Sequence, residues 1–412
     1  MRIVIVGAGI VGSMCAHALI DAGHEVTLVD PQDQPGRPCD GNAGWIAHTD
    51  IMPLASPKVW RHLPRWLMDP LGPLAIRPAY LPAIAPWIAR FVAASHPSRI
   101  ERSIGAIRAL NAEALPAWRR RLAGLDMAHH LRERGVLSVW TSTAALKAAA
   151  ATIERQRSFG IPVEVLDRSA LAALEPALGP RAAAGTLYPS GCHVSDPKAV
   201  VAELAERARQ RGARFLRGRA SRLEPHGDGI LVRCSDGAPV EADRAVVAAG
   251  AWSKPLAASL GDRIPLDTER GYNATLPSGV LGLSRPVAFE GEGFVTTPLD
   301  CGDRVGGAVE FGGLEAPADH RRTDAILDRL RTFLPDLPQD VDTSRRWMGF
   351  RPSLPDSLPV IGPSPKTPRV IYAFGHGHHG LTQSAVTGEI VSALVDGRKP
   401  SVDPRPYAAT RF

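Results

Sequence analysis

Cysteine and lysine are both scarce in this chain of 412 residues. The five cysteines form no CxxC pair, and an odd, widely spaced set in a long chain argues against a disulfide framework and against a zinc site. There are six lysines among the 48 basic residues, so arginine supplies nearly all of the formal net charge of +6. The densest basic run, Arg119 to Arg121, lies among Leu and Ala, which favours a solvated helix face over a nucleic-acid patch.

Long apolar runs are also missing. No stretch reaches 18 uninterrupted apolar residues, which excludes a membrane-spanning helix. The chain begins MRIVIVGAGIVG, which enters a strand directly and lacks the regions of a signal peptide. The expected location is therefore cytoplasmic. With 44% hydrophobic and 22% charged residues, the composition is that of a globular protein, and the length indicates two domains or one composite fold.

The N-terminal segment is typical of a dinucleotide-binding unit. Residues 3–6 form a continuous apolar run, as in a buried parallel strand. A glycine turn follows, residues 13–22 are predicted to be helical, and residues 26–29 form a second apolar strand that ends at Asp30. This order of strand, glycine turn, helix, strand and acidic residue predicts nucleotide binding.

Each residue of the turn has a physical role in that prediction. Gly7 permits a tight turn, Gly9 allows the backbone to approach a pyrophosphate, and Gly12 lets the helix pack closely on the strand. The helix N-terminus offers free N–H groups to phosphates. Asp30 is expected to accept hydrogen bonds from a ribose. These residues alone do not decide between NAD and FAD.

The rest of the chain predicts an interrupted nucleotide-binding domain. Residues 264–313 alternate short strands with glycine turns, as in an antiparallel sheet, whereas residues 370–374 and 380–395 predict a final buried strand and helix. A long helical region is expected over residues 100–134, broken near Pro116 and Gly124. The pattern predicts an α/β fold with a discontinuous Rossmann-like domain (1–90, 185–263 and 345–412) and an inserted antiparallel-sheet substrate-binding domain (91–184 and 264–344).

Residues 53–94 have an unusual composition. They contain Trp60, Trp66 and Trp87, many Leu, Ile and Pro residues, and four interspersed arginines. A set of short packed helices explains this composition. The alternative is an interfacial surface that makes peripheral contact with the inner membrane face, where a quinone would be available.

Seven motifs, taken together, carry a likeness to a known family. The chain resembles the D-amino-acid oxidase and dehydrogenase family of FAD enzymes over essentially its whole length. It is most similar to bacterial D-amino-acid dehydrogenases, including those that act on D-hydroxyproline. The motifs are GAGIVG at 7–12, GNAGWI at 41–46, GTLYPSGCHVSDP at 185–197, VVAAGAW at 246–252, ERGY at 269–272, GFRPSLPDSLPVIG at 349–362 and GHGHHGLT at 375–382.

The resemblance implies an FAD cofactor and the oxidation of an amino acid to an imino acid. The FAD domain would be doubly wound, and the sheet of the substrate domain would cover the flavin. Related sarcosine oxidases attach their flavin through a cysteine just upstream of the stretch that matches SLPD. This chain has Gly349, Phe350 and Arg351 there, so the FAD is expected to be noncovalent.

The resemblance also implies three catalytic residues. Arg351 would clamp the substrate carboxylate with its planar fork, Tyr272 would reach the carboxylate or close the pocket, and His378 or His379 would face the substrate. The residues implied in cofactor binding are Gly7, Gly9, Gly12, Asp30, Asn42, Ala43, Gly44, Ala220, Ala249, Gly250, Trp252, Gly375, Gly377, His378, His379, Gly380, Leu381 and Thr382.

Several histidines permit other interpretations. Three of them, His376, His378 and His379, lie within four residues, but no further metal ligands are evident near them in the sequence, so no metal is predicted. By resemblance, this loop passes close to the flavin and the following helix points its N-terminus at the flavin. His48 and His193 are expected to be structural.

Three functions remain open at this stage. The first is a D-amino-acid dehydrogenase that oxidises a D-amino acid, or a cyclic one such as D-proline or cis-4-hydroxy-D-proline, and passes electrons to a quinone or another carrier. The second is an oxidase of the same fold that uses O₂ and acts on glycine, sarcosine or another secondary amine. The third, a flavoprotein that binds nucleic acid, has little support from the scattered arginines. A partner subunit is a further implication of the resemblance.

Overall fold

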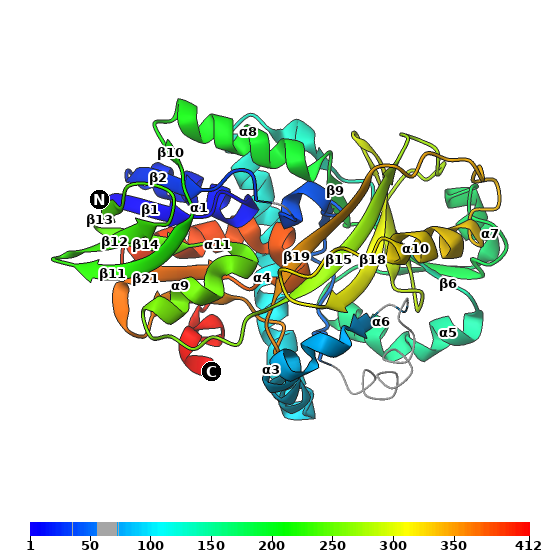
Figure 1. Ribbon diagram of the computed structural model, residues 1–412. Helices are drawn as coiled ribbons and strands as arrows, with labels where there is room; N and C mark the ends of the chain where they lie inside the picture. Colours follow the sequence, from blue (N-terminus) through cyan, green and yellow to red (C-terminus); the bar gives the residue numbers. More distant parts are fainter. Residues whose placement is uncertain (35, 56–71, 73) are drawn as a thin grey trace.

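The computed structural model contains a mainly parallel sheet covered on both faces and a larger, mainly antiparallel sheet beside it (Figure 1). The structure describes residues 1–34, 36–55, 72 and 74–412. Trp60 and Trp66 of the segment predicted as an interfacial surface lie outside the described residues.

The first sheet carries the predicted nucleotide-binding unit. Its strands are parallel except for the edge strand β20, which is antiparallel to β21. The predicted strands at 3–6, 26–29 and 370–374 are confirmed, and each is slightly longer than expected. In order across the sheet, the strands are β10 (Arg214–Arg217), β2 (Glu25–Asp30), β1 (Arg2–Val6), β14 (Arg244–Val247), β21 (Thr367–Phe374) and β20 (Val360–Ser364).

Helices cover one face of this sheet and a small antiparallel sheet covers the other. Because both faces are buried, the central strands are largely apolar, and their side chains alternate between two hydrophobic clusters. The helices are α1 (Ile10–Asp21), α4 (Pro97–Gly124), α8 (Pro197–Gln210) and α11 (Gly380–Val395). The other face packs against β11 (Ala220–His226), β12 (Gly229–Cys234), β13 (Val240–Ala242) and α9 (Ser253–Ser259).

The second sheet has nine strands and confirms the predicted antiparallel material. A third hydrophobic cluster joins one of its faces to α7 (Arg168–Leu174) and α10 (Arg321–Arg331). Its strands, in order, are β19 (Arg346–Ser353), β15 (Asp267–Leu276), β18 (Gly302–Phe311), β17 (Phe294–Leu299), β16 (Val287–Phe289), β6 (Val136–Trp140), β8 (Ala184–Tyr188) and β7 (Glu164–Leu166), and β4 (Leu74–Ile76) also pairs with β18.

Short elements connect the two sheets. A third small sheet consists of β3 (Trp45–Ile46), β9 (Cys192–Val194) and β5 (Leu131–Arg132). The helix α3 (Leu81–Ala94) precedes α4, and two short helices follow β6, namely α5 (Thr143–Ala148) and α6 (Ala150–Ser158). Ser142 caps the first of these two helices, because its side chain accepts from the Ala145 N–H at 3.1 Å.

Strand pairing crosses the predicted domain boundaries. The strands β4, β8 and β19 pair in the nine-stranded sheet, although most of their residues were assigned to the FAD-binding part. Conversely, α4 packs in the core of the first sheet, although its residues were assigned to the substrate-binding part. Periodicity identifies a strand but not the sheet it joins, so the exact division into domains stays a prediction.

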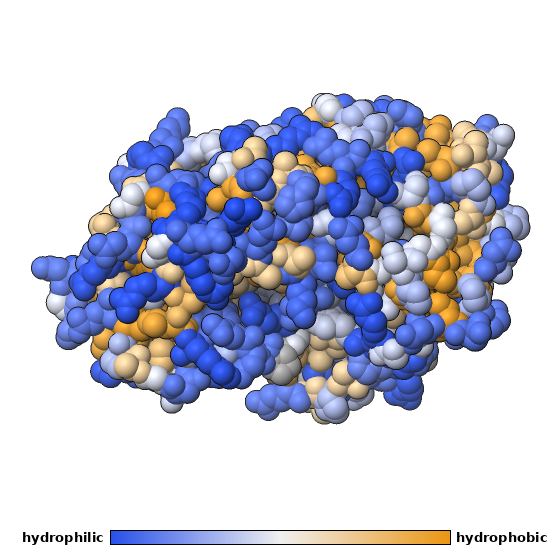
Figure 2. Space-filling model, turned by 90° about the horizontal axis from the view of Figure 1, so that it is seen from above, coloured by the Kyte–Doolittle hydropathy of each residue, from blue (hydrophilic) through white to orange (hydrophobic). Residues whose placement is uncertain are grey.

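The long helix α4 differs from its prediction in one respect. It continues through Pro116 and ends at Gly124. Its arginine run is fully paired, because Arg119, Arg120 and Arg121 each contact an acidic side chain, in the order Glu133, Glu389 and Asp21. This pairing agrees with a solvated helix face. Figure 2 shows polar side chains over most of one face of the molecule, with apolar patches toward its ends.

Candidate functional site

A cavity of about 1180 Å³ lies between the two sheets and brings most of the predicted site residues together. Its walls come from the glycine turn after β1, the segment from Gln34 to Met52, the middle of the nine-stranded sheet and the start of α11. Gly12, Gly44, Gly375 and Thr382 do not line it. The predicted residues that do are Gly7, Gly9, Asp30, Asn42, Ala43, Ala220, Ala249, Gly250, Trp252, Tyr272, Arg351, Gly377, His378, His379, Gly380 and Leu381.

The glycine turn has the shape that a pyrophosphate requires. Gly7 has a φ of +103°, and a Cβ there would lie 2.5 Å from the Ala248 carbonyl oxygen. A Cβ on Gly12 would lie 1.9 Å from the Gly7 carbonyl oxygen, so this glycine sets the contact of α1 with the turn. A Cβ on Gly9 would meet only the Cys39 Sγ, at 3.9 Å, and would point into otherwise open space. Backbone can therefore approach a ligand closely at Gly9.

Asp30 lies beside this turn at the end of β2. Its Oδ2 accepts from the Ala8 N–H at 2.8 Å and its Oδ1 accepts from the Gln32 N–H at 2.7 Å. The Arg37 guanidinium is 3.6 Å away. Asp30 therefore orders the glycine turn in addition to the ribose contact expected of it, and its position on the cavity wall is compatible with both roles.

These features together fit FAD. The open space at Gly9 lies at the N-terminus of α1, where N–H groups face a phosphate. The volume is at the upper end of the range for cofactor sites. The cavity continues from the end of β2 past Ala220 to the start of α11, so an extended dinucleotide has room along it.

Arg351 projects from β19 into the same cavity. Its guanidinium lies over Gly271 of the neighbouring strand, where a Cβ would be 2.5 Å from the Arg351 Cζ. One hydrogen bond within the described residues holds it, from Nη1 to the Ala308 carbonyl oxygen at 3.3 Å. Burial lowers the pKa of Arg351, and the charge of Glu269 partly opposes this. A guanidinium with most of its five donors unused is ready for a planar anion.

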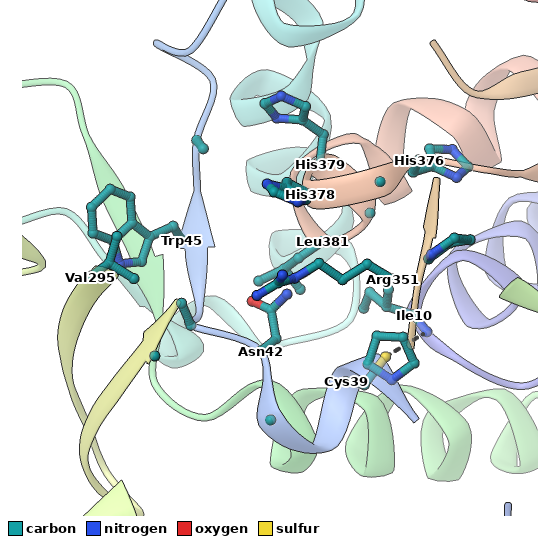
Figure 3. A pocket seen from close by; sticks show the side chains of 18 of the residues that line it. Ile10, Cys39, Asn42, Trp45, Val295, Arg351, His376, His378, His379 and Leu381 are labelled. Carbon is teal, nitrogen blue, oxygen red and sulfur yellow. Dashed lines mark hydrogen bonds between the residues drawn. The ribbon is translucent and has the colours of Figure 1, made fainter. Parts of the chain in front are cut away.

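Figure 3 shows how Arg351 lies relative to its neighbours. Its side chain extends between His378 and Asn42 in this view. The Asn42 side chain accepts from the Gly44 N–H at 2.7 Å, which orders the predicted flavin-side loop. Gly44 does not line the cavity itself, but it is hydrogen-bonded to Asn42, which does.

Glu269 is a charged residue next to the cavity-lining His378 that sequence reasoning did not single out. Its Oε2 contacts the His378 Nε2 at 2.5 Å, and Ser353 donates a hydrogen bond to its Oε1. The Glu269 side chain is 2% exposed, whereas that of His378 keeps 37%. Burial raises the pKa of Glu269, yet His378, Ser353 and Arg351 together hold it below its ordinary value. An acidic residue at the start of ERGY, inside an otherwise buried strand, was the available signal.

The structure places Tyr272 on the cavity wall with its hydroxyl already hydrogen-bonded. The residue lines the cavity, but its hydroxyl donates to the Glu310 Oε2 at 2.7 Å and accepts from the Asp319 N–H at 3.2 Å. Glu310 is in turn surrounded by arginines, including Arg270 at 3.1 Å. With both partners already present, the hydroxyl is engaged within the protein, and whether Tyr272 reaches the carboxylate or closes the pocket stays a prediction.

The histidine loop before α11 has three different environments. His376 is buried and its Nε2 contacts the Thr387 Oγ1 at 3.0 Å. His379 is buried with its Nε2 3.8 Å from Asp50, whereas His378 faces the cavity and Glu269. Both His378 and His379 line the cavity, so which of them faces the substrate stays a prediction. His48 and His193 do not line the cavity, as expected of structural residues.

Buried His376 predicts a dependence of stability on pH. Burial, together with the neighbouring His379, lowers the pKa of His376 from 6.5 to about 3. Between these values the unfolded chain binds a proton that the folded one does not, so stability is retained above pH 6.5 and lost as pH falls. We expect this residue to cost about 1.4 kcal/mol per pH unit below 6.5.

Denaturant unfolding at pH 7 and pH 5, with FAD saturating, measures this effect. His376→Gln keeps a polar group near Thr387 and should flatten the pH dependence relative to the parent protein. His17 and His193, whose pKa values burial also lowers to about 4, are present in both proteins and cancel. Parallel profiles for the two proteins would contradict the assignment.

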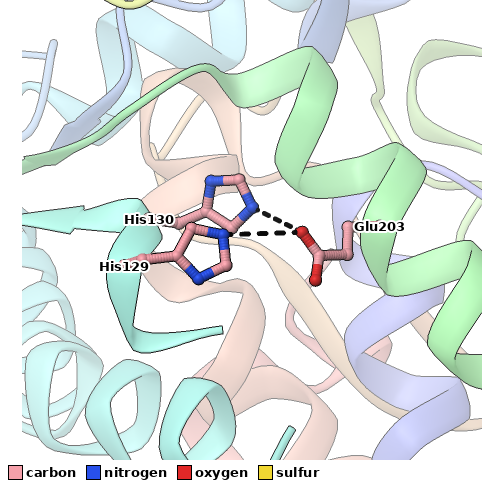
Figure 4. Close-up of side chains that lie close together, drawn as sticks. All are labelled: His129, His130 and Glu203. Carbon is pink, nitrogen blue, oxygen red and sulfur yellow. Dashed lines mark hydrogen bonds and ion pairs between the residues drawn. The ribbon is translucent and has the colours of Figure 1, made fainter. Parts of the chain in front are cut away.

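A cluster of metal-ligand residue types lies outside the cavity. His129, His130 and Glu203 come together on the surface (Figure 4). The Glu203 carboxylate contacts the His130 Nε2 at 2.9 Å and accepts from Arg207 at 3.2 Å, while the other His130 ring nitrogen contacts Ser195. Because these groups satisfy one another, the cluster gives no independent indication of a metal.

Comparison with known proteins extends the likeness over the whole chain. A family model described as FAD dependent oxidoreductase, named DAO, matches residues 2–394. A D-amino-acid oxidase from Bradyrhizobium diazoefficiens is 37% identical over 417 residues, covering 100% of this chain and 99% of that protein. A D-amino acid dehydrogenase from Ralstonia nicotianae is 32% identical, covering 100% of both.

Solved structures share the fold. Glycine oxidase from Geobacillus kaustophilus superposes with a TM-score of 0.75 at 22% identity, covering 100% of this chain and 99% of that one. At this level of identity the likeness shows the architecture alone. Among the described residues, no helix has both the length and the apolar character needed to cross a membrane.

Proposed function

Because the chain belongs to the DAO family of FAD-dependent oxidoreductases, we propose that it oxidises a D-amino acid to its imino acid with Arg351 as the carboxylate clamp. FAD is the cofactor. The Arg351 guanidinium, held over Gly271 with one internal hydrogen bond, is the observation that carries the proposal. The D-amino acid oxidase and dehydrogenase named among the relatives support the choice of substrate class.

Arg351 positions the substrate in this proposal. Two parallel hydrogen bonds from the guanidinium to the α-carboxylate fix the orientation of the α-carbon, and fixing that orientation lowers the entropic part of the barrier. Bound FAD would supply the acceptor for the α-hydrogen and its electron pair. The imino acid then leaves the site and hydrolyses to a 2-oxo acid and ammonia, whereas a cyclic substrate gives a cyclic imine.

The Glu269 and His378 pair handles a proton in this proposal. Glu269 accepts from the Nε2 of His378, so the neutral ring keeps its lone pair on Nδ1. His378 lines the cavity, and its Nδ1 is the group we assign to accept a proton from the substrate ammonium. The substrate amine becomes neutral by this transfer, and that neutrality is required before a hydride leaves the α-carbon.

The electron acceptor forms the second part of the proposal. We favour a quinone or another carrier, with O₂ as the alternative for an oxidase. Helix α3 supports contact with an apolar surface, since Leu81 is 45% exposed and Val92 46% exposed at its two ends. Co-sedimentation of the protein with lipid vesicles tests that contact, and its loss on Leu81→Ser with Val92→Ser is the expected result.

Anaerobic bleaching of the flavin tests the proposed function. The holoenzyme is mixed with D-amino acids, D-proline, cis-4-hydroxy-D-proline, glycine and sarcosine, with L-amino acids as controls. Reduction by D-amino acids and not by L-forms is expected. Failure of every D-amino acid to bleach a protein that retains FAD would overturn the proposal. Reoxidation of the reduced protein by air at a catalytic rate would favour the oxidase.

A further inference from the structure

One part of the cavity is not used by the function proposed above. We call it the distal lobe, and it lies where β6, β8, β16 and α6 meet, on the far side of β17 from Arg351. It is lined by aromatic rings and by hydroxyl, amide and carboxyl groups, so its walls are partly apolar and partly polar. Its residues are Ser138, Trp140, Gln156, Tyr188 and Glu290.

Glu290 is the acidic residue of the distal lobe. Its backbone N–H donates to the Val139 carbonyl oxygen at 3.0 Å, which fixes the residue directly after β16. The Ser138 hydroxyl donates to its Oε1 at 2.8 Å. No basic side chain among the described residues forms an ion pair with it. Glu292, two residues later, pairs with Arg181 at 2.8 Å.

The environment of Glu290 is costly for a carboxylate. Burial raises its pKa, and the negative charge of nearby Asp50 adds to the effect. Asp50 also lines the cavity, 3.8 Å from His379. Glu290 is partly buried and has no cation beside it, so a ligand that brings the opposite charge would stabilise its ionised form. The cavity places a bound ligand, and not a protein side chain, in the position to supply it.

The register of the sheet gives the separation between the lobe and Arg351. The Arg351 guanidinium crosses β15 and reaches the Ala308 carbonyl oxygen on β18. From β18 to β16 there are two strand spacings, roughly 10 Å in total. An extended lysine or arginine side chain carries its charge about 6–8 Å from the α-carboxyl carbon. Each of the two contacts also spans the length of a hydrogen bond. A substrate of this length can therefore contact Arg351 with its carboxylate and Glu290 with its side-chain charge.

Several residues between the two ends have no side chain, although Val295 of β17 contributes an apolar one. Gly306 and Gly307 of β18 and Gly293 before β17 line the cavity without side chains. Trp140 and Tyr188 provide aromatic surface in the distal lobe, which suits the methylene groups and the charge of a long cationic side chain. The Tyr188 hydroxyl is held by Gln156 at 3.1 Å, so the wall is ordered without a ligand.

We propose that this site selects D-amino acids with a cationic side chain, such as D-arginine and D-lysine, and that Glu290 binds the distal charge. The inference rests on the proposed function, because it takes Arg351 as the carboxylate clamp. Glu290 acts here as a specificity residue that contacts the substrate but not the reacting atoms.

Matched substrates isolate the distal charge. D-Citrulline has nearly the shape of D-arginine without its charge, and D-norleucine is the neutral counterpart of D-lysine. For the holoenzyme we expect kcat/KM to favour the charged member of each pair by roughly 10-fold or more, mainly through KM. If the protein oxidised D-citrulline and D-arginine with equal kcat/KM, or D-citrulline with the higher value, this inference would be overturned and the proposed function would stand. Inactivity toward all four would count against the proposed function itself.

Two glutamate variants then assign the preference to a residue. Glu290→Gln keeps the size and the hydrogen bond with Ser138, and we expect it to bring the ratio for each substrate pair close to one. Glu292→Gln makes the same chemical change two residues away, outside the cavity lining, and should leave the ratio unchanged. An equal loss of activity toward D-arginine and D-citrulline in Glu290→Gln would show a general structural role and overturn the assignment.

Discussion

Arg351→Ala is expected to lower kcat/KM for a D-amino acid by about 3–5 kcal/mol, the scale for removing one partner of a buried charge pair. The guanidinium is partly buried, lies over Gly271 and has donors to spare, so the substrate carboxylate would be its main partner. Steady-state kinetics on the FAD-saturated variant measure the effect. Arg351→Lys should recover only part of the loss, because an ammonium does not present two parallel donors.

A control on the same strand separates this effect from general damage to β19. Arg346 lies at its start, pairs with Asp324 at 2.6 Å and does not line the cavity. Arg346→Ala should leave kcat/KM within about twofold, since surface ion pairs contribute little. Near-unchanged kinetics in Arg351→Ala, with FAD still bound, would contradict the carboxylate clamp.

Gly271→Ala tests the same clamp without touching the arginine. The added Cβ would lie 2.5 Å from the Arg351 Cζ and Nη2, so the guanidinium must move. We expect a raised KM with FAD binding retained, because the displaced guanidinium would meet the substrate carboxylate less well. If a well-folded Gly271→Ala variant kept the KM of the parent protein, the guanidinium would be able to move aside without losing its contact with the substrate.

Gly9→Ala is expected to lower mainly the affinity for FAD, whereas Gly12→Ala is expected to lower mainly the stability of the fold. At Gly9 the new methyl group meets only Cys39 within the protein, at 3.9 Å, and enters the space that a pyrophosphate needs. We expect the apo protein to fold normally and to lose FAD affinity by two orders of magnitude or more, about 3 kcal/mol. At Gly12 the methyl group would lie 1.9 Å from the Gly7 carbonyl oxygen. We expect unfolding to become easier by about 3 kcal/mol, with or without FAD.

Two measurements distinguish these outcomes. Titration of the apo protein with FAD, followed by flavin fluorescence, reports the affinity, and denaturant unfolding of the apo protein reports the stability. A Gly9→Ala protein that binds FAD as tightly as the parent would show that the pyrophosphate lies elsewhere. A Gly12→Ala protein of full stability would show that α1 can shift away from the turn at little cost.

Local chemistry explains what sequence reasoning predicted well. The glycine turn, the buried strands β1 and β2 and the helix α11 are specified by short-range patterns, and each was predicted within a few residues. Arg351 was found because its motif resembles that of a known family, and the structure places it in the cavity. The contact of the Tyr272 hydroxyl with Glu310 was not predicted, because Glu310 comes from a different strand of the sheet.

The sequence by itself determined the class of the fold, the glycine turn and the family, because these depend on residues close together in the chain. Only the tertiary structure decided which sheet β8 and β19 join, that Glu269 holds His378, and that Glu290 stands in the cavity without a cation. The reason is physical. Glu269 and His378 are 109 residues apart, as Ser138 and Glu290 are 152 apart, and strand pairing and burial that no local pattern records bring them together.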